Sequence, residues 1–219
     1  MLKTYNNLKV CETDNVENIE ECDIAKVILP SLSENEKLML EKGFSFADRT
    51  LQTSIQAAKL DLNFQKLIRL SIEETSDYKN EIEKIALKSF PYDRRFHLRL
   101  DYNDEGLFEE IIKEWVNDLD NVLVAKYKDI VVGFLALKEI DESTLFIHFA
   151  AVDEKYRLTG AAMSLYAKAV QIAKEKGYKR LDGRISTKNT AVMNMYSFFD
   201  AHFENPLDIY IKEFDKGNK

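Results

Sequence analysis

A long apolar strand that leads through a short polar loop into an amphipathic helix most constrains this fold. The strand is predicted at 143–152, and the following loop contains the run Arg157-Leu158-Thr159-Gly160-Ala161-Ala162. The helix predicted at 161–176 has apolar residues at helical spacing, and Gly177 ends it. The first turn of a helix presents N–H groups without intrahelical partners and the positive end of the helix dipole. This arrangement suits a pyrophosphate.

The elements predicted around this strand alternate between helix and strand. A helix from Asn103 or Asp104 to Leu119 comes first, with Trp115 on its apolar face as an expected core residue. A hairpin at 121–137, a strand at 180–185, a helix opened by Asn189 and a strand at 208–214 complete this half.

The first ninety residues read as a smaller, mixed α/β unit. Strands are predicted at 44–54 and 67–72, and a helix is predicted from Thr75 or Ser76 to Ser89. Pro91 marks the expected boundary, because proline disfavours helix at the residue before it. We therefore predict an α/β (α+β) fold with an N-terminal subdomain at 1–90 and a larger domain at 91–219.

Composition narrows the class of protein. The chain has 219 residues, 45% of them hydrophobic and 32% charged, which predicts a packed core. A net charge of −7 argues against a general nucleic-acid surface. Cys11 and Cys22 have no His or Cys neighbour at metal-ligand spacing, so free thiols and no metal are expected. No signal-peptide pattern or membrane-length apolar run is present, so a cytoplasmic protein without a membrane segment is expected. The oligomeric state is left open, with a homodimer as one alternative.

Basic residues cluster just after Pro91. Arg94, Arg95, His97 and Arg99 fall within a few residues of one another in an acidic chain. One interpretation is a solvated loop that leads into the next helix. The other is a wall that contacts an anionic substrate, because guanidinium groups pair with phosphate in two-pronged geometry. In that second interpretation Arg95 and His97 are candidate substrate-binding residues.

The loop and the helix after it resemble the GNAT superfamily of acyl-CoA-dependent N-acyltransferases. That family's loop has Arg or Gln, two residues, Gly, one residue, and Gly or Ala, which Arg157, Gly160 and Ala162 match. It also has an Asn at the start of the next helix and a Tyr seven residues later, here Asn189 and Tyr196. The family often has Gly where this chain has Leu158. The resemblance implies a mixed central sheet with a splayed strand pair, flanking helices and acetyl-CoA as co-substrate.

Roles for individual residues follow from this resemblance. The loop from Arg157 to Ala162 would bind the CoA pyrophosphate, and Asn189 would hold the pantetheine arm. Ala151 and Val152 match the strand end whose backbone pairs with pantetheine amides. Tyr196 would protonate the leaving thiolate as a general acid. His148 lies on the same strand as a candidate base, and a packing histidine is an equally weighted alternative.

A narrower resemblance extends into the first half of the chain. The run 43–51, the turn at Arg95-Phe96-His97-Leu98 and the helix ending Glu114-Trp115-Val116 look like the dTDP-fucosamine acetyltransferases. This implies a nucleotide-linked 4-amino-4,6-dideoxy sugar as acceptor. Two alternatives stay open: an acceptor amine on a peptide, lysine or polyamine, which suits an acidic protein, and a non-catalytic acyl-CoA-binding protein.

Overall fold

Ten strands and five α-helices are present in the residues that this computed structural model describes, namely 1–19, 21–60, 70–101 and 106–214. The strands are β1 Leu2–Tyr5, β2 Leu8–Thr13, β3 Ile24–Pro30, β4 Ser45–Gln56, β5 Ser71–Thr75, β6 Val122–Tyr127, β7 Ile130–Asp141, β8 Thr144–Val152, β9 Arg180–Ser186 and β10 His202–Glu213. The helices are α1 Ser33–Glu41, α2 Lys79–Ser89, α3 Leu107–Asn117, α4 Ala161–Glu175 and α5 Thr190–Phe198. A short 3₁₀ helix, η4 Glu154–Thr159, joins β8 to α4.

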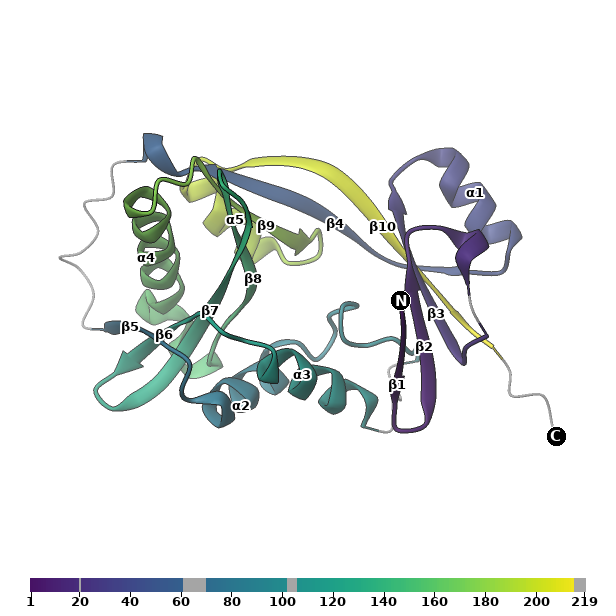
Figure 1. The fold of residues 1–219 in the computed structure, drawn as a ribbon, viewed down its shortest axis with the longest axis horizontal. Coiled ribbons are helices and arrows are strands. Elements are labelled where there is room, and N and C mark those ends of the chain that lie inside the picture. Colours follow the sequence, from purple (N-terminus) through teal and green to yellow (C-terminus); the bar gives the residue numbers. More distant parts are fainter. Residues whose placement is uncertain (20, 61–69, 102–105, 215–219) are drawn as a thin grey trace.

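All ten strands form one mixed sheet in the order β1-β2-β3-β10-β4-β9-β8-β7-β6-β5. Two neighbouring pairs are parallel, β2 with β3 and β8 with β9, and the other pairs are antiparallel. The long strands β4 and β10 run side by side from the half that contains α4 to the half that contains β1 and α1 (Figure 1). They make the two halves one continuous sheet.

Helices cover both faces of the sheet around β6 to β8. In β6, Val122 and Val124 pack into a core with α2 and α3, whereas Leu123 and Ala125 pack into a core with α4 and α5. Successive side chains of a strand point to opposite faces, so a continuous apolar run predicts burial on both sides. The sequence Val-Leu-Val-Ala meets this requirement.

Helix α3 connects the two halves of the molecule. One face, which includes Ile111, Ile112 and Val116, is buried in the core. Its Glu114 carboxylate accepts hydrogen bonds from Lys3 Nζ at 2.6 Å and from Tyr5 Oη at 2.5 Å, both on β1. These bonds fix β1 against α3. In Figure 1, α3 lies below the long strands β4 and β10 and reaches β1.

The expected mixed α/β fold with N-terminal strands is confirmed, as are the hairpin, β8, α4 and β9. The last strand was predicted too short. It begins at His202, and Pro206 is tolerated inside it because the β4 register shifts between Glu204 and Leu207.

Some predictions concern boundaries that the structure leaves open. The predicted caps Asn103 and Asp104, and the first half of the strand predicted at 67–72, lie outside the described residues; its second half overlaps the start of β5. β4 and β5 belong to the first ninety residues and yet pair with β9, β10 and β6. The boundary at residue 90 stays a prediction. Among the described helices, none is both long and apolar enough to cross a membrane.

Candidate active site

The parallel strands β8 and β9 pair over only part of their length. Four residues of each strand form the ladder, and the last pair joins Ile147 to Gly183. β8 nevertheless continues along β7 to Val152, and β9 continues along β4 to Ser186. The far parts of the two strands therefore leave an opening between them, as the resemblance implied.

A bulge in β8 marks the point where the opening begins. In β7, Ala136 pairs with Phe149, whereas the next residue, Leu137, pairs with Ile147. His148 is thus the extra residue of a β-bulge, which bends a strand and redirects a side chain. The bulge lies four residues before the end of β8 at Val152.

A cavity of about 440 Å³ lies on the α4 side of the opening, and we call it the α4 cavity. It is framed by the end of β8, by η4, and by the first turns of α4 and α5. The structure brings together in its wall several residues predicted to bind a cofactor, namely Ala151, Val152, Arg157, Ala162 and Asn189.

The first turn of α4 faces the α4 cavity. Gly160 turns the chain with a φ of 83°, a left-handed conformation that favours glycine. The first backbone bond of the helix runs from Ser164 N–H to the Gly160 carbonyl, so the N–H groups of 161–163 have no intrahelical partner. Ala162 and Met163 line the cavity. The start of α4 therefore presents unpaired main-chain N–H groups at the position where the sequence predicts an anion site.

The other loop residues do not reach this cavity with their side chains. Leu158 is fully exposed. The Thr159 hydroxyl donates to the Tyr156 carbonyl at 2.7 Å, which closes η4. Ala161, the first residue of α4, is completely buried in the core. The side chains of these positions do not line the α4 cavity, and their binding role stays a prediction.

Asn189 lies at the N-cap of α5, as predicted. Its Oδ1 accepts from Val192 N–H at 3.2 Å. The side-chain amide oxygen is thus committed to the helix, while the Nδ2 hydrogens remain oriented by it. Asn189 lines the α4 cavity and also the smaller space next to it.

A small space of about 60 Å³, the throat, lies at the opening between β8 and β9. It shares Ala150, Tyr166 and Asn189, among others, with the α4 cavity. It shares Arg95, His148 and Arg184, among others, with a third cavity on the opposite side. The three spaces form a row across the separated strands.

Tyr196 lines the throat and is almost completely buried. Its hydroxyl lies over β9 at Gly183, where an added Cβ would come within 2.3 Å of Tyr196 Oη. The Tyr166 ring packs edge-on against it at 5.2 Å. Burial raises the pKa of the Tyr196 hydroxyl above its ordinary value, so the phenol is protonated at neutral pH. Glycine at 183 provides the space that the hydroxyl occupies.

His148 lines both the throat and the third cavity. Its imidazole stacks on the Trp115 indole, with ring centroids 4.6 Å apart and planes 5° from parallel. Burial lowers the pKa of His148, and the positive charges of Lys138 and Arg95 lower it further. The ring is therefore neutral at pH 7 and able to accept a proton.

The third cavity, of about 300 Å³, lies against α3, and we call it the α3 cavity. Apolar walls come from α3 and the core, and cationic side chains come from four separate elements. The lining includes Lys3, Lys26, Arg95, Leu98, Ile111, Trp115, His148, Arg184 and Ile209. Trp115 packs on the core as predicted, but it also forms part of this wall.

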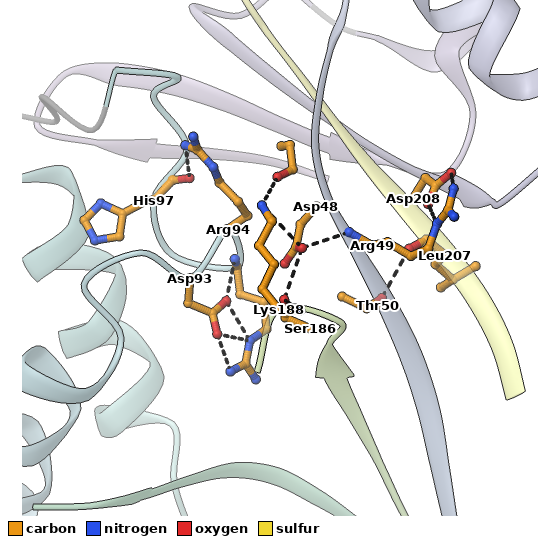
Figure 2. Close-up of polar contacts among 12 residues, drawn as sticks. Asp48, Arg49, Thr50, Asp93, Arg94, His97, Ser186, Lys188, Leu207 and Asp208 are labelled. Atoms are coloured by element: carbon orange, nitrogen blue, oxygen red, sulfur yellow. Dashed lines mark hydrogen bonds and ion pairs between the residues drawn. The ribbon is translucent and has the colours of Figure 1, made fainter. Parts of the chain in front are cut away.

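The basic cluster after Pro91 divides into structural and cavity-lining residues. Arg94 is buried and donates to the backbone carbonyl of His97 at 3.3 Å (Figure 2). It also donates to the carbonyls of Arg99 and Leu100 at 2.6 and 3.1 Å, and these bonds fix the loop. His97 is buried and stacks on Phe108, with ring centroids 4.1 Å apart. His97 is not among the residues that line the α3 cavity or the throat, so its predicted contact with substrate is not supported by the geometry.

Arg95 does reach the α3 cavity. Its guanidinium binds the Asp93 carboxylate with two prongs, Nε at 3.0 Å and Nη2 at 2.7 Å. It also packs over the Phe90 and Phe96 rings. Burial raises the pKa of Asp93, but the Arg95 charge outweighs this effect and the net pKa is lowered. Arg95 is therefore held rigidly at the cavity wall and already carries a counter-ion.

A second polar cluster fixes the turn before Asn189 (Figure 2). The buried Asp48 carboxylate of β4 accepts from Ser186 Oγ at 3.1 Å and pairs with Lys188 Nζ at 3.7 Å. Lys188 Nζ also donates to the Ala47 carbonyl at 2.9 Å. These contacts hold the end of β9 to β4, and with it the start of α5.

Arg184 and Lys26 are among the cavity residues that sequence reasoning missed. Arg184 was read as an ordinary position of a buried strand, although an arginine next to Gly183 inside such a strand is a signal of a polar site. Lys26 is almost completely buried in β3 and pairs with Glu12 of β2 at 2.8 Å. A lysine within an apolar run gave the same kind of signal, but the elements that pair with these strands are not predictable from local pattern.

Comparisons with known proteins identify the family to which this chain is similar. The model of the acetyltransferase (GNAT) family matches residues 80–200, which is more than half of the chain. No curated protein sequence matches the chain at a significant level.

Several solved structures are similar in fold. A functionally unknown conserved protein from Staphylococcus epidermidis is 17% identical, with a TM-score of 0.61, over 88% of this chain and 73% of its own. A putative GNAT acetyltransferase from Novosphingobium aromaticivorans is 10% identical, with a TM-score of 0.57, over 90% and 77%. A GCN5-related N-acetyltransferase from Sphaerobacter thermophilus is 13% identical, with a TM-score of 0.54, over 87% and 59%. Each of these structures covers a larger share of the chain than the region that the family model matches.

Proposed function

The chain belongs to the acetyltransferase (GNAT) family, and we propose that it transfers an acetyl group from acetyl-CoA to a small-molecule amine at the throat. The observation that carries this proposal is the row of three cavities across the separated strands. Two substrates that enter from opposite sides would meet beside His148 and Tyr196, which both line the throat.

Acetyl-CoA would occupy the α4 cavity. The unpaired N–H groups at the start of α4 and the Arg157 side chain suit the pyrophosphate, because both favour negative charge. The Nδ2 group of Asn189 is available to the pantetheine arm, since Oδ1 caps α5. An arm that runs along β8 would bring the thioester to the throat.

Main-chain groups of β8 support the placement of the thioester. Asp153 N–H donates to the Val132 carbonyl of β7 at 2.9 Å. N–H groups alternate in direction along an antiparallel ladder. The N–H of Val152 therefore points away from β7, to the side where β9 no longer pairs with β8. Such a group would bind a pantetheine amide or polarise the thioester carbonyl in the manner of an oxyanion donor.

The reaction we propose is direct attack of a neutral amine on the thioester carbonyl. The amine loses a proton to His148, directly or through water, since this imidazole is neutral at pH 7. A C–N bond forms as the C–S bond breaks, and the leaving thiolate takes a proton from Tyr196 Oη. The buried phenol is protonated at neutral pH and is therefore available as the acid.

For the acceptor we propose the amine of a nucleotide-linked aminodeoxy sugar bound in the α3 cavity. Support comes from the cationic side chains in that wall, among them Lys3, Lys26 and Arg184. At about 300 Å³ the cavity is at the small end of the range for ligand sites, so it would enclose the sugar and leave the nucleotide outside. An amine on a peptide, lysine or polyamine suits the net charge of −7 but not the charges of this wall.

The test combines donor binding with turnover. Melting temperature is measured with and without CoA, because a ligand that binds only the native state must raise it. Release of CoA from acetyl-CoA is then followed with aminosugar nucleotides, amino acids, peptides and polyamines. The proposal predicts a rise in melting temperature and turnover of at least one amine class. An unchanged melting temperature would contradict the donor site, and binding without any turnover would favour a non-catalytic acyl-CoA-binding protein.

A further inference from the structure

The cationic side chains of the α3 cavity differ in whether a carboxylate already neutralises them. Lys3 Nζ lies 2.6 Å from Glu114, and Lys26 Nζ lies 2.8 Å from Glu12. Arg95 is likewise paired, with Asp93, at 2.7 Å. In these three cases the positive charge has a partner within the protein.

Arg184 is the exception. Its Nη1 donates to Thr50 Oγ1 at 3.2 Å and to the Asn205 carbonyl at 3.1 Å, and both acceptors are neutral. No carboxylate in the described part of the chain forms an ion pair with it, and its Nε and Nη2 groups have no hydrogen-bond partner there. The guanidinium is anchored on one side and offers its other edge to the cavity.

The position of Arg184 relates it to the proposed reaction centre. Gly183 and Ile147 form the last pair of the β8–β9 ladder. Arg184 and His148 are the next residues of their strands, and both line the α3 cavity and the throat. Neighbouring strands are about 5 Å apart, so the two side chains begin close to each other on opposite sides of the opening. One compact ligand can therefore contact both Arg184 and His148.

We propose that Arg184 binds an anionic group, a carboxylate or a phosphate, that the acceptor carries a few bonds from its reacting amine. This inference rests on the proposed function and names the acceptor class for the same site. A guanidinium edge pairs with two oxygens of such a group. The body of the acceptor would pack on Trp115, and its amine would lie next to His148.

The same charges exclude a polycation. Among the described residues that line the α3 cavity, the one carboxylate is that of Glu12, which is paired with Lys26. A polyamine or a basic peptide would bring further positive charge next to Arg184 without an unpaired acid to meet it. The overall charge of the chain is negative, but the charge that the acceptor meets is positive.

The experiment uses pairs of amines that differ in one negative charge. Amino acids are compared with their amides, glucosamine 6-phosphate with glucosamine, and spermidine is included as a polycation. We expect the charged member of at least one pair to have a kcat/KM about tenfold or more above its neutral partner, and the two pairs distinguish carboxylate from phosphate. Equal values within both pairs, or a preference for spermidine, would overturn the proposal.

Variants assign the effect to Arg184. Arg184→Gln should lower kcat/KM for the charged member about thirtyfold, mainly through KM, and change the neutral member less than twofold. Arg184→Lys keeps the charge and should recover part of the loss. Arg180→Gln is the matched control, because Arg180 lies on the same strand and lines neither the α3 cavity nor the throat. An equal loss for charged and neutral members in Arg184→Gln would contradict the assignment.

A binding measurement separates this inference from the proposed function. In the presence of CoA, the charged member should raise the melting temperature of the native chain, and Arg184→Gln should abolish that rise. Turnover without any charge preference would overturn the inference and leave the acetyltransferase intact. Binding of the charged amine through Arg184 without turnover would support the inference and contradict the proposed acetyl transfer.

Discussion

The α4 cavity and the α3 cavity lie on opposite sides of the throat, and the chain builds them in different ways. The α4 cavity is framed mainly by residues between Ala150 and Tyr166, together with the start of α5 and the end of α2, and many of its lining side chains are small. The α3 cavity takes residues from Met1 to Ile209, and its character comes from large charged and aromatic side chains. A shared cofactor can be bound by backbone, whereas the partner specific to one enzyme requires side chains.

The two cavities also differ in the origin of their positive charge. On the α4 side, the positive field arises from a helix terminus and the exposed Arg157. On the α3 side, ion pairs fix most of the cations and Arg184 alone lacks an acidic partner in the described chain. Changes on the α4 side should thus alter donor binding, changes on the α3 side should alter acceptor use, and changes at the throat should alter the chemical step.

The largest effect is expected at the throat. Tyr196→Phe should lower kcat by about a hundredfold, the usual contribution of a positioned acid, and leave the dissociation constant of acetyl-CoA nearly unchanged. Steady-state kinetics and calorimetry measure the two. Tyr210→Phe is the matched control, because Tyr210 is also fully buried but lines none of the three spaces. Equal rates in the wild type and Tyr196→Phe would remove this hydroxyl from the mechanism.

His148→Gln tests the throat from its other side. The base must be neutral, so kcat should fall as pH drops through the pKa of His148, which burial places below its ordinary value of 6.5. Activity should be flat with respect to this group at and above pH 7. The variant should lose the acidic limb and be about thirtyfold slower at pH 7.5.

The control for this substitution is the exposed His202 of β10. His202→Gln should keep both the rate and the acidic limb. An acidic limb that persists unchanged in His148→Gln would assign that pKa to another group and leave His148 as a packing residue.

Arg157→Ala tests the donor side alone. Loss of one charge-assisted hydrogen bond of about 1.5 kcal/mol should raise the KM for acetyl-CoA about tenfold, with kcat and the KM for the amine unchanged. The difference should shrink at high salt, since Arg157 is exposed. Lys155→Ala, a neighbouring exposed cation that does not line the α4 cavity, should behave as the wild type. A rise in the KM for the amine, with the KM for acetyl-CoA unchanged, would contradict the assignment of Arg157 to the donor site.

The smallest effect is expected from the polar cluster that holds Asn189. Lys188→Met removes the contacts to Asp48 and Ala47. The Lys188 end of the pair is exposed, and the buried Asp48 carboxylate keeps its hydrogen bonds from Ser186 Oγ and Arg49 N–H. The loss should therefore be about 1 kcal/mol or less, and the KM for acetyl-CoA should rise about two- to threefold. Lys176→Met, in an exposed position after α4, serves as control. A tenfold or larger change would mean that Lys188 contacts the donor directly.

The sequence was informative where a site depends on local pattern. The strand, the glycine turn and the helix predicted a main-chain anion site. The family resemblance singled out Asn189 and Tyr196, which the structure places at a helix N-cap and in the throat. The alternation of apolar residues likewise predicted most elements. Each of these features is determined within about ten residues of chain.

The α3 cavity was not predictable, because its residues come from distant parts of the chain. Arg94, Arg95 and His97 looked equivalent in the sequence, but loop carbonyls, Asp93 and Phe108 give them three different environments. Arg184 acquires its role because β4 and β10 bring Thr50 and Asn205 to it. Such roles depend on long-range strand pairing, and no local periodicity specifies which strands pair.

The central claim is that acetyl transfer occurs directly between two substrates bound at the same time in separate cavities. Initial rates over a grid of acetyl-CoA and acceptor concentrations test it most directly. The account predicts double-reciprocal lines that intersect, as a ternary complex requires. Parallel lines, the pattern of a covalent acetyl-enzyme, would contradict it.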